Sequence, residues 1–191
     1  MFAKLFTSTL LLAALAAPAR GEETLLRGPH PFNKQNFLAL QAGWGLGFGD
    51  APVGTKLQGD YQYRLSGPTW LDLQIGVLAG GCRGRAQPCG TGSGKAVDIL
   101  AGAAWNFQTS VPLVPYARVA AGPVFLFPEG VRSSTGFLLR GGAGVHYFFY
   151  DWFGVGAEIT LAWGLAIYDL SALRSGNLTT VDGNVGARWH F

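Results

Sequence analysis

Hydrophobic and polar or small side chains alternate with a period of two along most of the chain after residue 36. The first run shows the pattern: Leu38, Leu40 and Ala42 fall on one face, and Ala39 and Gln41 fall on the other. Further alternating runs follow near residues 57, 71, 97, 119, 137, 153 and 181. Strict alternation is typical of strands with two different faces, and no helical pattern separates the runs. The pattern predicts eight strands of about ten to fifteen residues.

The connections between these runs alternate in length. Residues 66–69, 108–112 and 150–151 form short turns, whereas 80–94, 128–134 and 168–177 are longer and more polar. Only one connection at the second end, residues 49–53, is short. Short turns at one end and longer loops at the other are typical of up-and-down membrane barrels. The predicted fold is therefore all-β: an eight-stranded antiparallel up-and-down transmembrane β-barrel, whose strands reach the length needed to cross a bilayer.

Composition supports a surface that does not face water. Charged residues make up 13% of the chain, against about 25% in an ordinary soluble domain. Hydrophobic residues make up 49%, which excludes a disordered chain. The basic residues are scattered rather than clustered, so no nucleic-acid partner is expected. Charges interrupt every long apolar stretch after the first twenty residues, so transmembrane helices are not expected either.

The N-terminus reads as a targeting segment. Lys4 precedes the apolar run Leu5–Ala17, and Ala17-Pro18-Ala19 offers the small residues that a signal peptidase requires. We expect a signal peptide over residues 1–19, a polar leader over 20–36 and the barrel over 37–191. The alternative is a buried N-terminal helix.

The face opposite the apolar one is rich in glycine and alanine. Glycine is hard to explain on a wet outer surface, but it makes room inside a narrow eight-stranded barrel. Aromatic residues are concentrated where the strands meet the ends, as in the girdles at lipid–water boundaries. Those expected at the short turns are Tyr63, Trp70, Trp105, Phe107, Tyr147, Phe149, Trp152 and Trp189. We therefore expect the apolar face to contact lipid. The alternative is a soluble ligand-binding barrel with that face inside.

A signal sequence, eight alternating strands and the ending Gly186-Ala187-Arg188-Trp189-His190-Phe191 resemble the small outer-membrane barrels of Gram-negative bacteria. The resemblance is to the OmpA-barrel, OmpX and OmpW-like group as a whole. It implies an outer-membrane location, a monomer, and contact with membrane lipids and lipopolysaccharide. It also implies that the outer-membrane barrel assembly machinery recognises a C-terminal signal formed by Val185, Ala187, Trp189 and Phe191.

Charged residues on the predicted inner face should form ion pairs, because an isolated buried charge costs several kcal/mol. If one turn closes about Pro68, Arg64 lies across from Asp72. If the last two strands pair symmetrically about their loop, Glu158 faces Arg188, with His146 as a diagonal neighbour. We expect a salt-bridged plug that closes the lumen; a gated proton or ion path is the alternative. The candidates are Asp60, Arg64, Asp72, Asp98, Arg118, Arg140, His146, Glu158, Asp182 and Arg188.

The longest predicted loop holds both cysteines, Cys82 and Cys89. In an oxidising envelope we expect them to form a disulfide, since a metal site would need further ligands nearby. No metal or other cofactor is expected. Arg83 and Arg85 in the same loop are candidates for contact with lipopolysaccharide phosphates or an acidic partner. The alternative is that both are simply solvated.

Three functions follow. The favoured one is a non-enzymatic barrel with a structural or surface-interaction role through its extracellular loops. The second is an OmpW-like conduit for small hydrophobic molecules, which the small or apolar outer-end residues Gly45, Gly47, Leu78, Leu100 and Leu138 would permit. The third, a lipid A-modifying enzyme, is disfavoured. His30 precedes the barrel, and no serine lies within a few positions of His146 or His190.

Overall fold

The computed structural model describes residues 34–49, 51–81, 93–109, 111–128, 133–169 and 174–191. These residues form eight strands, in agreement with the predicted number. They are β1 (Asn36–Gly49), β2 (Val53–Ser66), β3 (Thr69–Gly81), β4 (Ser93–Asn106), β5 (Leu113–Pro128), β6 (Ser134–Tyr150), β7 (Phe153–Asp169) and β8 (Arg174–His190). Among the described residues, no helix is long and apolar enough to cross a membrane.

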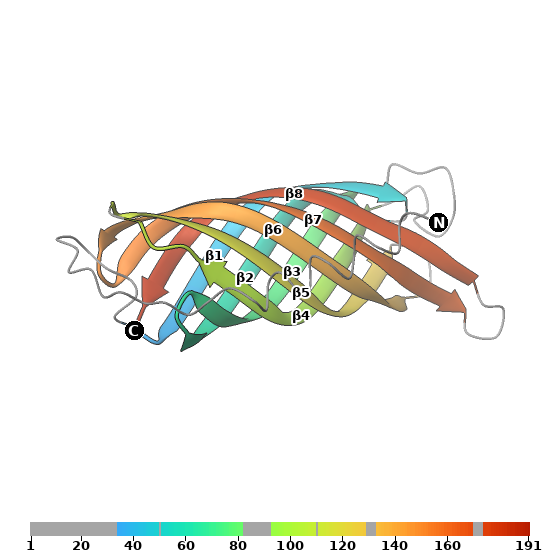
Figure 1. Ribbon diagram of the computed structural model, residues 1–191. Helices are drawn as coiled ribbons and strands as arrows, with labels where there is room; N and C mark the ends of the chain where they lie inside the picture. Colours follow the sequence, from blue (N-terminus) through green and yellow to red (C-terminus); the bar gives the residue numbers. More distant parts are fainter. Residues whose placement is uncertain (1–33, 50, 82–92, 110, 129–132, 170–173) are drawn as a thin grey trace, which may run out of the picture.

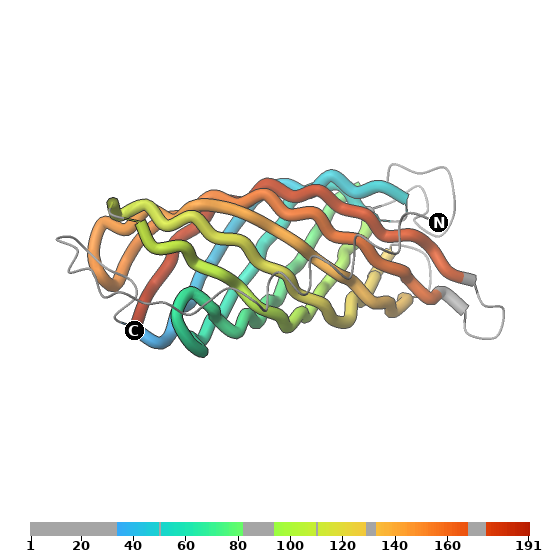
Figure 2. The backbone as a smooth tube through the Cα atoms, in the orientation of Figure 1, coloured from blue at the N-terminus to red at the C-terminus, as the bar shows by residue number. Residues whose placement is uncertain are grey.

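The strands form one closed antiparallel barrel in sequence order, and β8 pairs with β1. Phe37 lies opposite His190 and Gly49 opposite Leu178 along this seam. Reciprocal backbone hydrogen bonds of 3.1 Å between Asn36 and Phe191 extend it by one pair. All eight strands are inclined to the barrel axis in the same sense (Figures 1 and 2). Closure gives each strand two neighbours and removes the open edges that promote aggregation.

The two ends of the barrel differ less than predicted. At one end the β3–β4 connection, residues 82–92, is long, but the β1–β2, β5–β6 and β7–β8 connections are all shorter than the β4–β5 connection, residues 107–112. The β2–β3, β4–β5 and β6–β7 connections lie at the other end, together with the C-terminus (Figure 1). We call this the short-turn end and the opposite one the long-loop end. Three boundaries differ from the predicted ones. β1 begins at Asn36, and β7 and β8 extend to Asp169 and from Arg174, into the predicted 168–177 loop.

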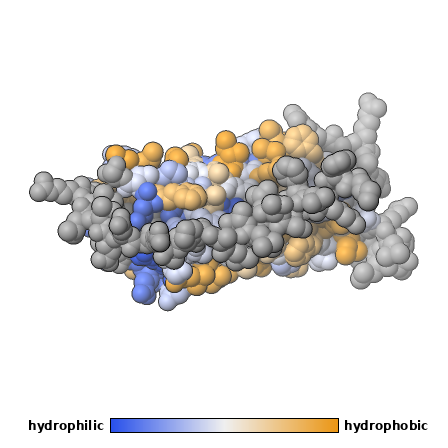
Figure 3. All heavy atoms as spheres, viewed as in Figure 1, coloured by the Kyte–Doolittle hydropathy of each residue, from blue (hydrophilic) through white to orange (hydrophobic). Residues whose placement is uncertain are grey.

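The orientation of the two faces is the one expected for a membrane barrel. Leu40, Ile75 and Leu161 are each more than half exposed, at 57%, 54% and 56%. Arg118 and Glu158, in contrast, are each only 3% exposed and lie inside. Hydrophobic patches accordingly extend along the visible outer surface in Figure 3. The apolar face points outward, so the soluble-barrel alternative is wrong.

One aromatic residue departs from the predicted girdle. Trp70 is 1% exposed and packs inside the barrel, with its ring 6.2 Å from that of His190. Trp70 directly precedes the outward-facing Leu71, so alternation points it into the lumen. The predicted girdle was based on distance from a turn and did not consider which face of the strand Trp70 occupies.

A closed barrel should show heat-modifiable electrophoretic mobility. We expect the full chain, folded in detergent, to migrate differently before and after boiling. The closed ladder resists dodecyl sulfate until heat opens it, because each strand is hydrogen-bonded on both sides. The measurement is a gel of paired unboiled and boiled samples, with protein kept unfolded in urea as the control. Identical mobility of folded and boiled protein would contradict the closed barrel.

Candidate functional site

The lumen is filled at three levels between the two ends. A turn-end cluster of apolar side chains lies at the short-turn end, and it consists of Phe37, Ala39, Trp70, Ala104, Val114 and Phe148. A polar layer lies above it. A loop-end cluster follows, consisting of Ala51, Leu78, Ala96, Leu100, Ala120, Val124, Leu126, Leu138, Ala162, Ala166 and Leu178. The charged residues are thus enclosed by apolar side chains at both ends.

Arg118 of β5 is the centre of the polar layer. One terminal nitrogen, Nη1, lies 2.9 Å from Asp60 Oδ1 and 3.7 Å from Asp72 Oδ2, and the other, Nη2, lies 2.5 Å from Glu158 Oε1. The three carboxylates come from β2, β3 and β7, so a single guanidinium links strands around the barrel. All four side chains are almost fully buried. Such charges are stable in a protein interior only when paired and hydrogen-bonded.

A second cation, Arg140 of β6, forms a two-pronged ion pair with Asp98 of β4. Its Nη1 and Nη2 atoms donate to the two carboxylate oxygens at 2.8 and 2.7 Å. Arg140 Nη1 also donates to Gln74 Oε1 at 3.2 Å, while Gln74 Nε2 donates to Asp72 at 2.6 Å. This glutamine therefore joins the Arg140 pair to the Arg118 cluster.

Glutamines complete the hydrogen bonding of Asp60 and Asp72. Gln41 and Gln58 donate to the two oxygens of Asp60 at 2.6 and 2.7 Å. Gln62 donates to the remaining oxygen of Asp72 at 3.1 Å. The sequence analysis gave these glutamines no part in the network.

Sequence reasoning also missed a third ion pair, between Lys56 and Asp182. Lys56 Nζ donates to Asp182 Oδ2, and both side chains are 1% exposed. The hydroxyl of Thr160 donates to the same oxygen at 3.0 Å. The alternation already indicated that Lys56 points inward, because Lys56 continues the inward-facing series of Gln58 and Asp60 toward the long-loop end.

The fourth buried cation, Arg188 of β8, interacts with aromatic groups. Its Nη2 donates to the Tyr116 hydroxyl at 2.9 Å, and its Nη1 contacts His146 Nε2. The guanidinium carbon lies 4.8 Å from the ring centroids of both Phe37 and Tyr116, in cation–π geometry. The Tyr116 hydroxyl in turn donates to Glu158 at 2.5 Å. Arg188 thereby connects the Arg118 cluster to the turn-end cluster.

Glycines provide the space that these side chains occupy. A Cβ atom at Gly76 would lie 2.7 Å from Asp98 Oδ1, and one at Gly45 would lie 2.7 Å from Asp182 Oδ1. A Cβ at Gly156 would lie 2.8 Å from both Arg188 Nε and His146 Nδ1. These positions on neighbouring strands explain why the inner face is rich in glycine.

The predicted pair of Arg64 and Asp72 is wrong. The turn closes about Gly67, which has a φ of 50°, so Gln62 lies opposite Asp72 and Arg64 opposite Trp70. Positive φ is the conformation that glycine supplies in tight hairpin turns. Arg64 instead lies at the barrel rim, where its Nε donates to Gly67 O at 3.2 Å.

The predicted facing of Glu158 and Arg188 is also wrong. Glu158 lies opposite Asn184, and Arg188 lies opposite Gly154. The reason is that β8 extends further into the predicted 168–177 loop than β7 does. The centre of their pairing therefore lies at a lower residue number than predicted. The expected proximity of His146 to Arg188 is confirmed by their contact.

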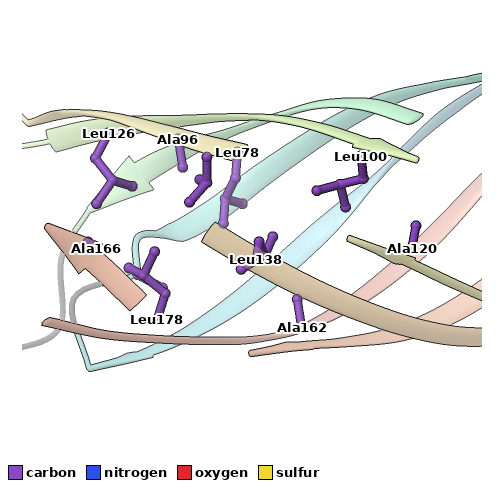
Figure 4. Close-up of a cluster of buried hydrophobic side chains, with 11 residues drawn as sticks. Leu78, Ala96, Leu100, Ala120, Leu126, Leu138, Ala162, Ala166 and Leu178 are labelled. Carbon is purple, nitrogen blue, oxygen red and sulfur yellow. The ribbon is translucent and has the colours of Figure 1, made fainter. Parts of the chain in front are cut away.

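The cavities that the described residues form inside the barrel are small. The cavity below the long-loop end, lined by Leu78, Leu138 and the ion pairs of Lys56 and Arg140, has a volume of about 20 Å³. A cavity within the turn-end cluster has about 10 Å³. Figure 4 shows the side chains of the loop-end cluster converging on the barrel axis. Volumes of this size hold about one water molecule each.

The two described histidines are both inside. His146 is stacked on Tyr116, with ring centroids 3.9 Å apart, and His190 packs against Phe37 and Phe148 at 4.8 Å. They are 2% and 7% exposed. His30 lies outside the described residues. Within residues 34–191 as described, no group of three metal-ligating side chains converges.

Other predicted residues lie at the surface or outside the description. Val185, Ala187, Trp189 and Phe191 share the outward face of the C-terminal segment, and Val185 and Phe191 are 63% and 58% exposed. The predicted disulfide of Cys82 and Cys89 and the loop residues Arg83 and Arg85 lie outside the described residues, as do the predicted signal peptide and most of the predicted leader.

Solved structures with a similar fold are bacterial outer-membrane proteins. Neisserial surface protein A matches with a TM-score of 0.63 and 17% identity, over 82% of this chain and 97% of that one. The outer membrane protein OprG from Pseudomonas aeruginosa matches with a TM-score of 0.53 and 11% identity, over 83% and 96%. A major outer membrane protein from Thermus thermophilus matches with a TM-score of 0.51 and 13% identity, over 82% and 99%.

The fold is that of a small outer-membrane β-barrel. At these levels of identity the likeness establishes architecture and not activity. Protein-family models and curated protein sequences gave no match.

The glycine positions predict a selective effect of adding one methyl group. Gly156→Ala should lower the free energy of unfolding by about 1–3 kcal/mol, because Arg188 or His146 must move within a packed interior. Gly141→Ala is the matched control, since a Cβ there meets no atom within 4 Å. The measurement is urea unfolding in lipid vesicles, followed by tryptophan fluorescence. Equal losses for both variants would show that Gly156 does not make room for the ions.

Removing the central cation should be far more costly than removing the rim cation. Arg118→Met leaves three buried carboxylates without their shared partner and should cost about 3–5 kcal/mol. Arg64→Met should cost less than about 1 kcal/mol, because Arg64 is only partly buried at the rim, where water screens its charge. The same urea titration measures both variants. A loss at Arg64 as large as that at Arg118 would contradict the assigned network.

Proposed function

We propose that this chain is an integral, non-enzymatic protein of a Gram-negative outer membrane, with a lumen closed to ions. Its role is structural or is exerted through the long-loop end. The observation that carries the proposal is the continuous filling of the lumen, in which a four-cation polar layer is enclosed by two apolar clusters.

The outer surface supports the membrane location. Leucine, isoleucine and valine predominate along the middle of the strands, and Ile159 is 70% exposed. Aromatic rings surround the short-turn end of β6, β7 and β8, where Tyr147 contacts Phe149 and Trp152 contacts Phe153. An apolar band with aromatic borders matches a bilayer with its two interfaces.

The interior gives no support to an enzymatic role. His146 and His190 are enclosed in the lumen on the short-turn side of the polar layer, and they contact an arginine and aromatic rings. A base for hydrolysis must reach both its nucleophile and the substrate. A lipid substrate in either leaflet cannot approach a ring packed between Phe37 and Tyr116.

The C-terminal segment supports recognition during assembly. Val185, Ala187, Trp189 and Phe191 form an outward-facing series along the seam where β8 meets β1. Because these side chains face outward, they are accessible both before and after the seam closes. We therefore assign the series to contact with the barrel assembly machinery. Monomeric insertion among phospholipids and lipopolysaccharide completes the proposal.

A second candidate is a conduit for small hydrophobic molecules. It is favoured by the loop-end cluster and by an interruption of the β4–β5 ladder beside it. In the β4–β5 ladder, Asp98 pairs with Val124 and Ala101 with Ala121. Ile99 and Leu100, which lie between them, have no ladder partner on β5. Pro123 stands opposite this position and has no N–H to donate.

A planar-bilayer recording tests the closed lumen. We expect the purified full chain to give no steady ionic current, because the cavities described in the lumen each hold about one water molecule. A general porin in the same bilayer is the positive control, and heat-modifiable mobility verifies that the inserted protein is folded. Stable, large channels from the pure protein would overturn the closed-lumen proposal.

The same preparation separates the two candidates. Proteoliposomes and protein-free liposomes are loaded with a fatty-acid-binding fluorescent reporter and given a small apolar probe. Equal entry rates support the closed scaffold. Faster entry through the protein, abolished by Leu100→Trp, would establish the conduit instead.

A further inference from the structure

One charged side chain lies on the outward face of the barrel. Among the outward-facing strand residues whose side chains the structure describes, Lys95 of β4 is the only charged one, and it is exposed. It shares this face with Val97 and Ile99 and lies two residues after the start of β4, at the long-loop end. None of the ion pairs among the described residues includes it. A lysine on a lipid-facing strand is stable where its ammonium reaches the headgroup level.

Beside Lys95 the side-chain cover of the sheet has a gap, which we call the β3 gap. Lys95 lies directly opposite Ala79 of β3, which in turn lies opposite Thr55 of β2. Thr55 is exposed and faces outward as Lys95 does. Because neighbouring strands are about 4.8 Å apart, the backbones of Thr55 and Lys95 are about 10 Å apart, with only the methyl group of Ala79 between them.

The β3 gap opens toward the long-loop end. Gly81 is the next outward position on β3, and a Cβ atom there would meet no described atom within 4 Å. The gap is thus bordered by an ammonium on one strand and a hydroxyl on the other, and it is open above. A group that enters it from the headgroup region can reach both.

An apolar track continues from the gap toward the middle of the barrel on the same face. Val77 lies opposite Val97, and Ile75 lies opposite Ile99. Ile75 and Ile99 are 54% and 50% exposed. Polar groups at the border of the apolar band and hydrophobic side chains below them match the two parts of a lipid molecule.

We propose that the β3 gap binds the phosphate group of a lipid in the leaflet at the long-loop end. The ammonium of Lys95 donates charge-assisted hydrogen bonds to the phosphate oxygens, and the Thr55 hydroxyl donates a neutral one. The acyl chains lie along the track of Ile75 and Ile99. The inference rests on the membrane location proposed above.

A lipid suits the gap better than a soluble anion does. One exposed cation binds a dissolved anion weakly, since water and salt screen its charge. A lipid already lies at the interface, so its headgroup is present at high local concentration, and its chains gain the apolar contact.

Acetylation of individual lysines tests the proposal, because a bound phosphate shields the amine that it contacts. The folded full chain is placed in neutral-detergent micelles with dioleoyl phosphatidic acid or dioleoylglycerol, which differ only in the phosphate. Mass spectrometry then measures the acetylation rate at each lysine. We expect saturating phosphatidic acid to slow acetylation of Lys95 about fivefold relative to dioleoylglycerol. Lys34, which is exposed at the short-turn end, is the internal control and should be unaffected.

Two variants separate the gap from the mere presence of a lysine at the interface. Ala79→Leu fills the gap without changing any charge and should abolish the protection of Lys95. Ala101→Leu is the matched control, because it adds the same bulk to an exposed outward position of β4 nearer its other end. It should leave the protection intact.

Three results would overturn the assignment of the gap: equal protection by both lipids, equal protection of Lys34, or full protection in Ala79→Leu. The same protection by millimolar inorganic phosphate alone would show a soluble-anion site and overturn the lipid source.

Separate readouts distinguish failure of this site from other failures. Heat-modifiable mobility of each variant shows whether it has folded. Insertion of the wild-type chain into liposomes tests the membrane location independently. A protein that inserts but shows no phosphate-dependent protection refutes the site alone, whereas one that does not insert refutes the proposed function.

Discussion

Much of this structure depends on the need to pair charges inside a very narrow barrel. Eight strands enclose a lumen that side chains alone can fill. The described lumen holds four cations, Lys56, Arg118, Arg140 and Arg188, and five carboxylates. A charge without a partner there would be strongly destabilising. Each is therefore placed within reach of partners on other strands, and the pairs fix how those strands lie relative to one another.

Glycine and glutamine are the residues that make this pairing possible. Glycines such as Gly76 and Gly156 leave room beside a neighbouring strand for a carboxylate, guanidinium or imidazole. Gln58 and Gln74 accept from Arg140 through oxygen and donate to an aspartate through nitrogen. A glutamine used in this way links two ion pairs without adding charge. The outward-facing strand surface needs no comparable network, because an apolar exterior requires only apolar side chains.

The interior and the rim have different physical roles. Inside, burial makes each ion pair part of a network that stabilises one arrangement of the strands. At the rim, Arg64 donates from Nε to Gly67 O and is only partly buried. Arg64 shows the contrast, because a register change of two residues moves it from the predicted lumen network to the rim of the barrel.

Strand number, antiparallel order and the inward or outward direction of nearly every side chain follow from the sequence alone. They depend on a period of two and on turn residues, which are local properties. Alternation also predicts that Arg118 and Glu158 point inward. The alternation also points Trp70 inward. Its predicted place in the outer girdle was wrong because that prediction used only its distance from a turn.

The partners of the inward residues were decided by tertiary structure. The pair of Arg64 with Asp72 required knowing that the turn centres on Gly67, and that of Glu158 with Arg188 required knowing where β7 and β8 end. Arg118 joins β2, β3 and β7 across the axis, a reach that depends on strand tilt and barrel closure. Periodicity states which way a side chain points. Only the closed, tilted barrel brings side chains from distant strands within bonding distance.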